Sequence, residues 1–571
     1  MSGFHRLPAT APARFGTEID RTEPVGGRYD GRPLVGLYGD TLASALLASG
    51  SAAFGRSALL GRPRGLFALG ADDPHAWARA EADADPVPAD FLGLTEGFVA
   101  RAPADDASPL ARLFERRSSA AAGASGRLPP LGRRLAARLA RRLPLPAIDR
   151  PFDAAATPAT RESCDVLVVG AGLAGLAAAS AAAAAGLRVV VVEAAPRVGG
   201  AADLYDGAVD GRPPLAWARD RAAGLVDRGA EIALRAVAVA VDASGAVTVL
   251  DRGPGPRPGP LRLRLIEPRA LVIAAGWRER GLLFAGNDRP GVILAGAARA
   301  LLRRYAVAPG ARVVIATAGD EGHRTAIDLR EAGVAVEMTV DARESPDTPM
   351  VNLAKALGAP MSFASVVDGV ETSSAGDRIV SVTARNRFGD GVAAAPRRLF
   401  ADALVVSGGL APRDELWGGA GDAIVVTDGP DMAEAVAGGH AAGVEAARRL
   451  GAAVDRPAPN ASGAADAPDD AAARAAYRER LTPDGARTAF VDLGADVTAA
   501  DVAEAAARGV GGGALARWLG LGRGRDGGRA LRSLAIDETA ALSASTTADL
   551  ATPPARLTLG ALAARAALAE S

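Results

Sequence analysis

Residues 165–200 constrain the fold more than any other part of the chain. Residues 166–169 are a short continuous apolar run, typical of a parallel strand that is covered on both faces. Gly170, Gly172 and Gly175 then follow in the G-x-G-x-x-G spacing. In this pattern the first glycine allows a tight turn, the second lets the backbone approach a pyrophosphate, and the third lets a helix pack closely on the strand. The segment therefore predicts a strand, a phosphate-binding turn and the start of a helix.

A helix and a second strand complete this unit. Residues 176–185 are almost entirely alanine and leucine, the strongest helix formers, and Gly186 stands where a glycine ends such a helix. Residues 187–192 form the next apolar run, and Glu193 lies at its end, where a carboxylate can accept hydrogen bonds from a ribose diol. A glycine-rich turn in an alanine-rich protein would explain the glycines but not Glu193. We therefore predict a dinucleotide-binding site.

The composition excludes several classes of protein. The chain has 571 residues, and its net charge of −1, from 65 basic and 66 acidic residues, gives no sign of nucleic-acid binding. Cys164 is the only cysteine, which rules out an internal disulfide, a cysteine-ligated cluster and a redox cysteine pair. The four histidines are scattered through the chain, and we predict no metal site. Without a signal-peptide core or a run of about twenty apolar residues, the sequence predicts a cytoplasmic protein.

The sequence identifies no catalytic residue. We find no activated nucleophile, no Ser/His/Asp set and no redox cysteine pair. We interpret the isolated histidines His323 and His440 as surface or cap residues. The sequence therefore leaves the catalytic residues unknown.

The first hundred residues predict a small β-rich unit with one helix. Asp30-Gly31 is a hairpin turn signal, and Asp40 or Thr41 is a good N-cap for a helix that Gly50 ends. Six motifs of the chain are distinctive: Asp30-Gly-Arg, Gly39-Asp-Thr-Leu-Ala, Gly55-Arg-Ser, Arg62-Pro-Arg-Gly, Asp73-Pro-His and Asn287-Asp-Arg-Pro-Gly. They resemble the alpha subunit of sarcosine oxidase, of the heterotetrameric, complex-flavin kind. The resemblance implies an N-terminal [2Fe–2S] ferredoxin-like domain that has lost its cluster cysteines, and we expect no iron–sulfur cluster.

A second resemblance concerns the cofactor site. The run Ala270-Leu-Val-Ile-Ala-Ala-Gly-Trp resembles the strand-end motif that closes over the cofactor in flavoproteins with two dinucleotide-binding domains. In such flavoproteins an aspartate before the helix near residue 432 touches the ribityl or ribose group, and both Asp428 and Asp431 are candidates. The expected cofactor-binding residues are Gly170, Gly172, Leu173, Ala174, Gly175, Glu193, Ala194, Arg197, Gly199, Gly200, Ala275 and Gly276. Either NAD or FAD fits this site.

A second strand–turn–helix unit begins near residue 312. Residues 312–317 and 334–340 predict two strands, and the turn between them holds Gly319 and Gly322. The turn also places Asp320 and Glu321 where a pyrophosphate would lie, and two carboxylates there would repel the ligand that a helix N-terminus attracts. We expect this unit to be a retained nucleotide-binding domain without nucleotide.

The expected fold is α/β: a Rossmann-type flavoprotein fold with two dinucleotide-binding domains, flanked by a cysteine-less [2Fe–2S] ferredoxin-like N-terminal domain and a small helical C-terminal domain. The last domain, in which Thr498 can N-cap a helix, resembles bacterioferritin-associated ferredoxin without its cluster. Longer members of the family continue into a folate-binding, aminomethyltransferase-like domain, which we expect this chain to lack. The expected boundaries are 1–100 (ferredoxin-like domain), 101–160 (linker), 161–305 and 401–452 (first dinucleotide-binding domain), 306–400 (inserted second domain), 453–480 (linker), 481–550 (small helical domain) and 551–571 (tail).

The resemblance implies the alpha-like subunit of a flavin-dependent oxidoreductase of sarcosine, other amines or imino acids. In the family this subunit binds NAD and contributes to an FMN site shared with a beta subunit, which carries FAD and oxidises the amine. We therefore expect a beta-like, FAD-containing partner, a small amine or imino-acid substrate on that partner, and neither nucleic acid nor membrane as a partner. The alternatives are a stand-alone NAD(P)H-dependent flavin oxidoreductase and a non-catalytic nucleotide-binding scaffold.

Overall fold

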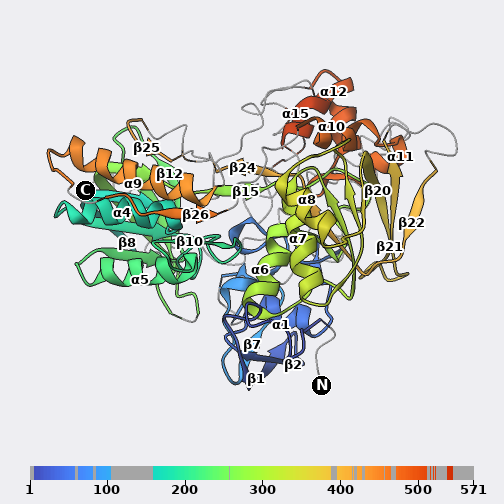
Figure 1. Cartoon of the computed structure of the whole chain (residues 1–571), viewed down its shortest axis with the longest axis horizontal. Coiled ribbons are helices and arrows are strands. Elements are labelled where there is room, and N and C mark those ends of the chain that lie inside the picture. Colours follow the sequence, from blue (N-terminus) through green and yellow to red (C-terminus); the bar gives the residue numbers. More distant parts are fainter. Residues whose placement is uncertain are drawn as a thin grey trace, which may run out of the picture.

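The computed structural model describes most of the chain. The described residues are 5–57, 62–80, 85–103, 158–255, 257–387, 395–413, 416, 421–426, 431–454, 457–463, 471–510, 515, 519, 521 and 536–543. They form two α/β units, a small β-rich unit at the N-terminus and a group of short helices toward the C-terminus (Figure 1). The expected fold class is confirmed. No helix within the described ranges is both long enough and apolar enough to cross a bilayer.

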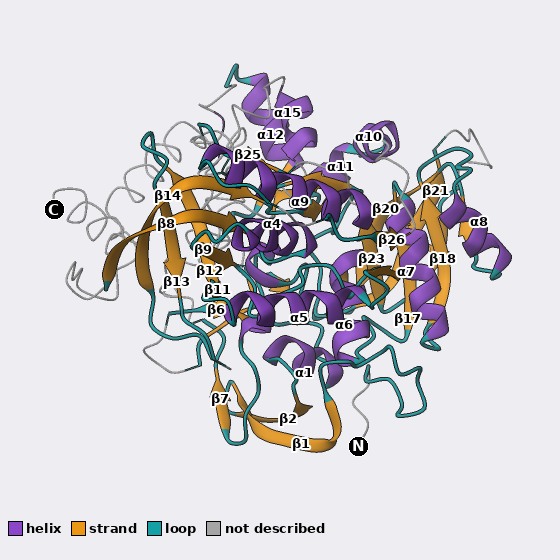
Figure 2. Ribbon diagram, turned by 60° about the vertical axis from the view of Figure 1, so that its left-hand side comes forward, coloured by secondary structure: helices purple, strands orange, loops and turns teal. Residues whose placement is uncertain are grey.

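The first α/β unit is built on a mixed seven-stranded sheet with the order β11-β9-β8-β14-β13-β12, in which β25 also pairs with β14. Its strands are β8 (Ala159–Val169), β9 (Val189–Glu193), β11 (Glu231–Leu234), β12 (Ala236–Val241), β13 (Val247–Asp251), β14 (Arg262–Ile273) and β25 (Ile424–Val425). The helices α4 (Leu173–Ala184), α5 (Pro214–Val226) and α9 (Met432–Arg449) pack on one face (Figure 2). The β-branched side chains of β8 and β9 fill the core on both faces, as the continuous apolar runs predicted. The pair β10 (Gly207–Val209) and β26 (Ala461–Gly463) lies beside this unit.

Small residues let α4 and α9 approach each other closely. A Cβ atom at Gly439 or Gly443 of α9 would overlap the backbone of Ala174 or Ala178 of α4. Because these glycines have no side chain, the two helices can lie backbone to backbone. This contact fixes α4, whose N-terminus forms part of the candidate site.

The second α/β unit has a parallel five-stranded sheet with the order β16-β23-β17-β18-β19. Its elements are β16 (Val292–Leu294), α6 (Ala295–Tyr305), β17 (Arg312–Thr317), α7 (Asp320–Glu331), β18 (Ala335–Asp341), α8 (Pro349–Ala356), β19 (Met361–Ser362) and β23 (Ala403–Ser407). A three-stranded sheet lies beside it, formed by β20 (Ser365–Thr372), β21 (Ile379–Asn386) and β22 (Arg397–Leu399). The antiparallel strands β15 (Trp277–Glu279) and β24 (Leu410–Pro412) connect the two units (Figure 1).

The N-terminal unit confirms the predicted hairpin and helix. Asp30 and Gly31, both with positive φ, turn the chain between β1 (Asp20–Tyr29) and β2 (Arg32–Tyr38). Thr41 caps α1 (Leu42–Ala48) in a capping box with Ser44. The remaining elements are β3 (Gly55–Arg56), β4 (Pro63–Arg64), η1 (Gly70–Asp72), β5 (Trp77–Ala78), β6 (Val87–Pro88), η2 (Ala89–Phe91) and β7 (Phe98–Ala100).

The C-terminal group contains α10 (Ala471–Glu479), α11 (Pro483–Ala486), β27 (Phe490–Asp492), β28 (Val497–Thr498), α12 (Ala499–Ala507) and α15 (Ile536–Ser543). Thr498 is the N-cap of α12 and forms a capping box with Asp501, as expected. Buried residues of this group, of the N-terminal unit and of the second α/β unit form one continuous hydrophobic core. These three parts therefore pack as one body.

Candidate functional site

A cleft of about 500 Å³ opens where β8, β9 and β14 end. All the expected cofactor-binding residues line it except Gly175, which packs beneath the turn. Their role in binding a cofactor is still a prediction. Further walls come from the N-terminal unit, from β15 and β24, and from α6.

The glycine turn has the geometry that its spacing predicted. Gly170 has a φ of 105°, and a Cβ there would overlap the carbonyl oxygen of Ala274, so only glycine fits. A Cβ at Gly175 would overlap the Gly170 carbonyl, which explains the close packing of helix on strand. Gly172 is the N-cap of α4, makes no side-chain cap and lies beside open space. The first N–H groups of α4 can therefore bind an anion in the cleft.

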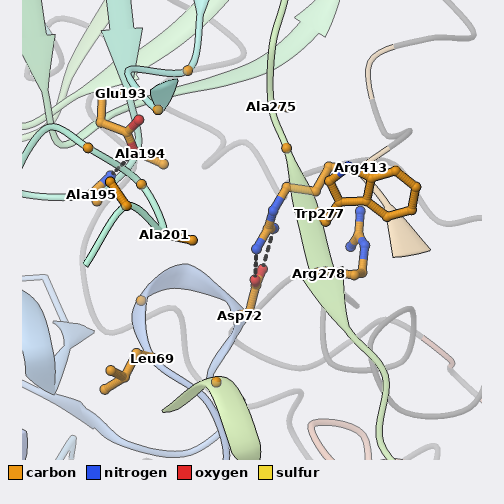
Figure 3. Close-up of a pocket in the computed structure, with 18 of the residues that line it drawn as sticks. Leu69, Asp72, Glu193, Ala194, Ala195, Ala201, Ala275, Trp277, Arg278 and Arg413 are labelled. Carbon is orange, nitrogen blue, oxygen red and sulfur yellow. Dashed lines mark hydrogen bonds and ion pairs between the residues drawn. The ribbon is translucent and has the colours of Figure 1, made fainter. Parts of the chain in front are cut away.

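Glu193 at the end of β9 connects two loops of the cleft. Its Oε2 accepts a hydrogen bond from the Ala171 N–H at 2.7 Å. Its Oε1 accepts one from the Ala195 N–H at 2.8 Å (Figure 3). Burial raises the pKa of this carboxyl above its ordinary value, while the two N–H groups and the charges of Arg413 and Arg197 act in the opposite direction. Each oxygen keeps a second lone pair, so a ribose hydroxyl can still bind.

The loop after Glu193 is held from outside by α6. Arg304 donates a hydrogen bond to Asp203 at 2.7 Å and a longer one, of 3.3 Å, to the Gly200 carbonyl. Burial alone would raise the pKa of Asp203, but the guanidinium of Arg304 lowers it below its ordinary value. Arg197 also donates to the Tyr305 hydroxyl at 3.2 Å. The loop is therefore fixed before any ligand binds.

The N-terminal unit supplies a wall of the cleft that the sequence did not reveal. Leu69, Asp72 and Asp90 line the cleft from this side. Arg413 reaches across the cleft and donates to both carboxylate oxygens of Asp72, one bond measuring 3.1 Å (Figure 3). The Arg413 backbone N–H also donates to the Gly276 carbonyl at 3.0 Å, which ties the bridge to the predicted closing turn. No local pattern could have signalled a contact between residues this far apart in the chain.

The structure describes one of the two aspartates considered for the ribityl contact, whose role toward a cofactor stays a prediction. Asp431 is the N-cap of α9, and its Oδ1 accepts hydrogen bonds from the N–H groups of Ala433 and Glu434. Asp428 lies outside the described residues. Asp431 therefore has a structural role at the start of α9.

The turn of the second α/β unit is occupied by its own side chains. Asp320 accepts a hydrogen bond from Arg343 at 2.9 Å, and Glu321 accepts one from Arg299 at 2.8 Å.

The interpretation of His323 as a surface or cap residue is wrong. Its side chain is fully buried and its Nε2 lies 2.8 Å from Asp341 Oδ2, because the polar turn packs inward against β18.

Two family models match the chain. A model described as an FAD binding domain matches residues 165–220, which contain the glycine turn, Glu193 and the loop that follows it. A model described as a 2Fe-2S iron-sulfur cluster binding domain matches residues 22–104.

The second match contradicts our expectation of no iron–sulfur cluster, which is corrected here. That expectation used the absence of cysteines together with the family resemblance, whereas the match uses the pattern of the whole domain. The matched range itself contains no cysteine; Cys164 lies in β8, where burial raises the pKa of its thiol to about 12. Since these residues provide none of the thiolates that usually hold such a cluster, we assign no chemical step to one.

Comparison with known proteins extends the similarity over most of the chain. The chain is 32% identical over 422 residues to "Sarcosine oxidase subunit alpha" of Corynebacterium sp. (strain P-1), covering 72% of this chain and 39% of that protein. It is 36% identical over 347 residues to the protein of the same name from Rhizobium meliloti (strain 1021), covering 57% of this chain and 35% of that one. The chain therefore spans well under half the length of these relatives.

Among solved structures, L-proline dehydrogenase from P. horikoshii has a similar fold. The TM-score is 0.64 at 17% identity, and the match covers 95% of this chain and 98% of that chain. The expected resemblance is confirmed by the sequence matches: the chain is a homologue of the sarcosine oxidase alpha subunit over 72% of its length.

Proposed function

We propose that the chain is the alpha-like subunit of a flavin-dependent oxidoreductase of sarcosine or related small amines or imino acids. In this proposal it binds FAD in the cleft and needs a beta-like partner subunit for substrate oxidation. One observation carries the proposal: the residues matched by the FAD-binding family model include the glycine turn and the Glu193 carboxylate, and both line the cleft. This match also favours FAD over NAD.

The cleft suits the ADP half of FAD. The N-terminus of α4 would bind the pyrophosphate, Glu193 would accept hydrogen bonds from the ribose, and Arg197 and Arg413 would add positive charge. Bound FAD supplies the hydride chemistry, which the protein orients. The wall from the N-terminal unit would exclude water from one side.

Substrate oxidation is assigned to the partner because the cleft lacks suitable groups. Within the described residues, neither a histidine nor a cysteine lines the cleft. The relatives are named as subunits, which supports a hetero-oligomer. An FMN site shared with the partner belongs to the same proposal.

The stand-alone flavin oxidoreductase is the second candidate, and it would need a nicotinamide nucleotide in the second α/β unit. There, Asp320 and Glu321 fill the turn and are paired with Arg343 and Arg299. This arrangement favours the first candidate.

The test is to purify the chain alone and to identify its extractable nucleotide by absorbance and chromatography. We expect FAD, no oxidation of NADH, and oxidation of sarcosine or another secondary amine only after co-expression with a beta-like subunit. Oxidation of NADH by the chain alone would support the second candidate. A chain that neither contains nor binds FAD would overturn the proposal.

A further inference from the structure

Besides the glycine turn, α6 and the end of β15 line the cleft, and we call this part its α6 end. This end is lined by Tyr205, Glu279 and Glu321, and by Gly296, Ala297 and Ala300 of α6. If the adenosine ribose lies at Glu193 and the pyrophosphate at α4, the other half of a dinucleotide extends toward this end. The inference below therefore rests on the proposed binding of FAD.

Glu279, the last residue of β15, has one carboxyl oxygen in use and one without a partner. Its Oε2 accepts a hydrogen bond of 2.6 Å from the N–H of Gly296, in the first turn of α6. Its Oε1 is buried and makes no hydrogen bond. A buried, ionised oxygen without a donor is costly, whereas a protonated oxygen can itself donate to a ligand.

The groups around Glu279 act on its charge in both directions. Burial is the largest influence and raises the pKa, and the carboxylate of Glu321 on α7 raises it further. The Gly296 N–H, the Ser407 hydroxyl at the end of β23 and the Arg299 guanidinium on α6 lower it. Ser407 is near the carboxyl group but does not reach hydrogen-bond geometry. The balance raises the pKa of Glu279 to about 8, so the group is mostly protonated at neutral pH.

We propose that Glu279 donates a hydrogen bond through Oε1 to a carbonyl oxygen or ring nitrogen on the flavin half of bound FAD. Oε2 remains the acceptor for Gly296, which places the proton on Oε1. Because Glu321 also lines this end, a ligand that ends in a hydrogen-bond acceptor fits better than one that ends in a phosphate. Glu279 is thus a specificity-determining residue of the cleft.

The test uses the full chain and three variants. Glu279→Gln keeps an acceptor for Gly296 and a donor for the ligand but cannot ionise, Glu279→Leu removes both, and Glu479→Gln changes an exposed residue of α10 as a control. The dissociation constant of FAD is measured by fluorescence titration from about pH 6.5 to 9.5. For the wild type and Glu479→Gln, the constant should increase by up to about tenfold per pH unit once Glu279 ionises. For Glu279→Gln it should stay constant, and Glu279→Leu should bind FAD about tenfold more weakly at pH 7.

Parallel pH profiles of the FAD dissociation constant for the wild type and Glu279→Gln would overturn the inference. An unchanged affinity of Glu279→Leu for FAD would overturn it too. Neither result would contradict the binding of FAD itself. A wild-type chain that binds no FAD at any pH would overturn both this inference and the proposed function. Infrared spectroscopy gives a reading without ligand. At pH 7 the wild-type spectrum should contain a carbonyl band of a protonated carboxylic acid that is missing from Glu279→Gln, and identical spectra would overturn the assigned protonation.

Discussion

Gly172 and Gly175 lie in the same turn, but the structure requires them for different reasons. Gly175 has no room for a side chain because a Cβ would overlap the Gly170 carbonyl. Gly172 has an ordinary negative φ and no atom within 4 Å of a built Cβ, so its methyl group would enter the cleft. A substitution at Gly175 should therefore affect folding, whereas a substitution at Gly172 should affect ligand binding.

We predict opposite phenotypes for alanine at these two sites. Gly175→Ala should lower the free energy of unfolding by about 1–3 kcal/mol, because the helix must shift away from the strand. Gly172→Ala should change it by less than about 1 kcal/mol, yet weaken FAD binding by about tenfold. Thermal unfolding and FAD titration of both variants check this. If Gly172→Ala binds FAD as tightly as the wild type, the pyrophosphate does not lie at this turn.

Glu279 should also make stability depend on pH in the absence of ligand. Its pKa in the folded chain, about 8, lies above its ordinary value of 4.5, so the folded state holds the proton more tightly than the unfolded state. The stabilisation is complete below about pH 4.5 and is lost as the pH rises toward about 8. Glu279→Gln has no carboxyl group that titrates at this position, so this pH-dependent loss of stability should be absent from the variant.

Denaturant unfolding between about pH 5 and 9 measures this effect. Relative to Glu279→Gln, the wild type should lose stability on the order of a few kcal/mol between about pH 5 and 8, with no further change above that range. The exposed control Glu479→Gln should follow the wild type. A constant difference between the wild type and Glu279→Gln would show that Glu279 is already ionised at about pH 5.

Among the elements, those organised by local sequence were predicted well. The turn at 170–175, the helix α4 and the strand β9 are specified within one short segment, so spacing and propensity sufficed. The sequence contains two apolar runs, 261–266 and 270–273, separated by polar residues, whereas the structure has one strand, β14. The polar residues between the runs continue the strand because they pair across it: Arg161 donates to Glu267 at 2.9 Å and Arg269 donates to Asp165 at 3.0 Å.

One fully buried arginine of α6 pairs with two carboxylates of α7, one of which also pairs with Arg303 of α6. Arg299 is fully buried and bonds to Glu321 at 2.8 Å and to Asp328 at 3.0 Å. Replacing this buried charge removes a close partner from each carboxylate and leaves Asp328 with Arg303 at 2.9 Å and Glu321 with Arg324 at 3.4 Å. This pair of helices also carries Gly296 and Glu321 of the cleft.

Arg299→Met should therefore lower the free energy of unfolding by about 3–5 kcal/mol. The matched control is Arg312→Met, which removes an exposed pair with Glu337 and should have little effect. Chemical denaturation of both variants makes the comparison. Equal stability of the two variants would show that the buried network does not hold the helices together.

At the scale of the whole molecule, the sequence could not predict which segments meet. Arg62-Pro-Arg-Gly and Asn287-Asp-Arg-Pro-Gly were recognised only as separate motifs. In the structure Arg64 is fully buried and pairs with Asp288 of the second motif and with Asp496 of the C-terminal group. Contacts between distant segments depend on tertiary packing, which leaves no local signal. The Asp72–Arg413 bridge across the cleft was missed for the same reason.

This bridge joins the N-terminal unit to the strands that connect the two α/β units. Arg413 is 27% exposed and Asp72 is 12% exposed, so the pair is only partly screened by water. Burial raises the pKa of Glu193, and the charge of Arg413 is among the influences that oppose this rise. If the proposed function holds, Arg413 has two separable roles: it fixes the wall, and it supplies positive charge for the anionic ligand.

Two variants distinguish these roles. Asp72→Asn removes the ion pair but keeps the Arg413 charge, so hydrogen exchange in residues 68–72 should become faster while the affinity for FAD falls by less than about threefold. Arg413→Met removes both, so exchange should become faster and the affinity should fall by about tenfold. The control Arg448→Met removes an exposed pair with Glu445 on α9 and should change neither quantity.

If hydrogen exchange is unchanged in both cleft variants, the bridge does not hold the wall. If Arg413→Met binds FAD as Asp72→Asn does, the ligand does not use the charge of Arg413, and the anionic part of FAD must lie elsewhere in the cleft.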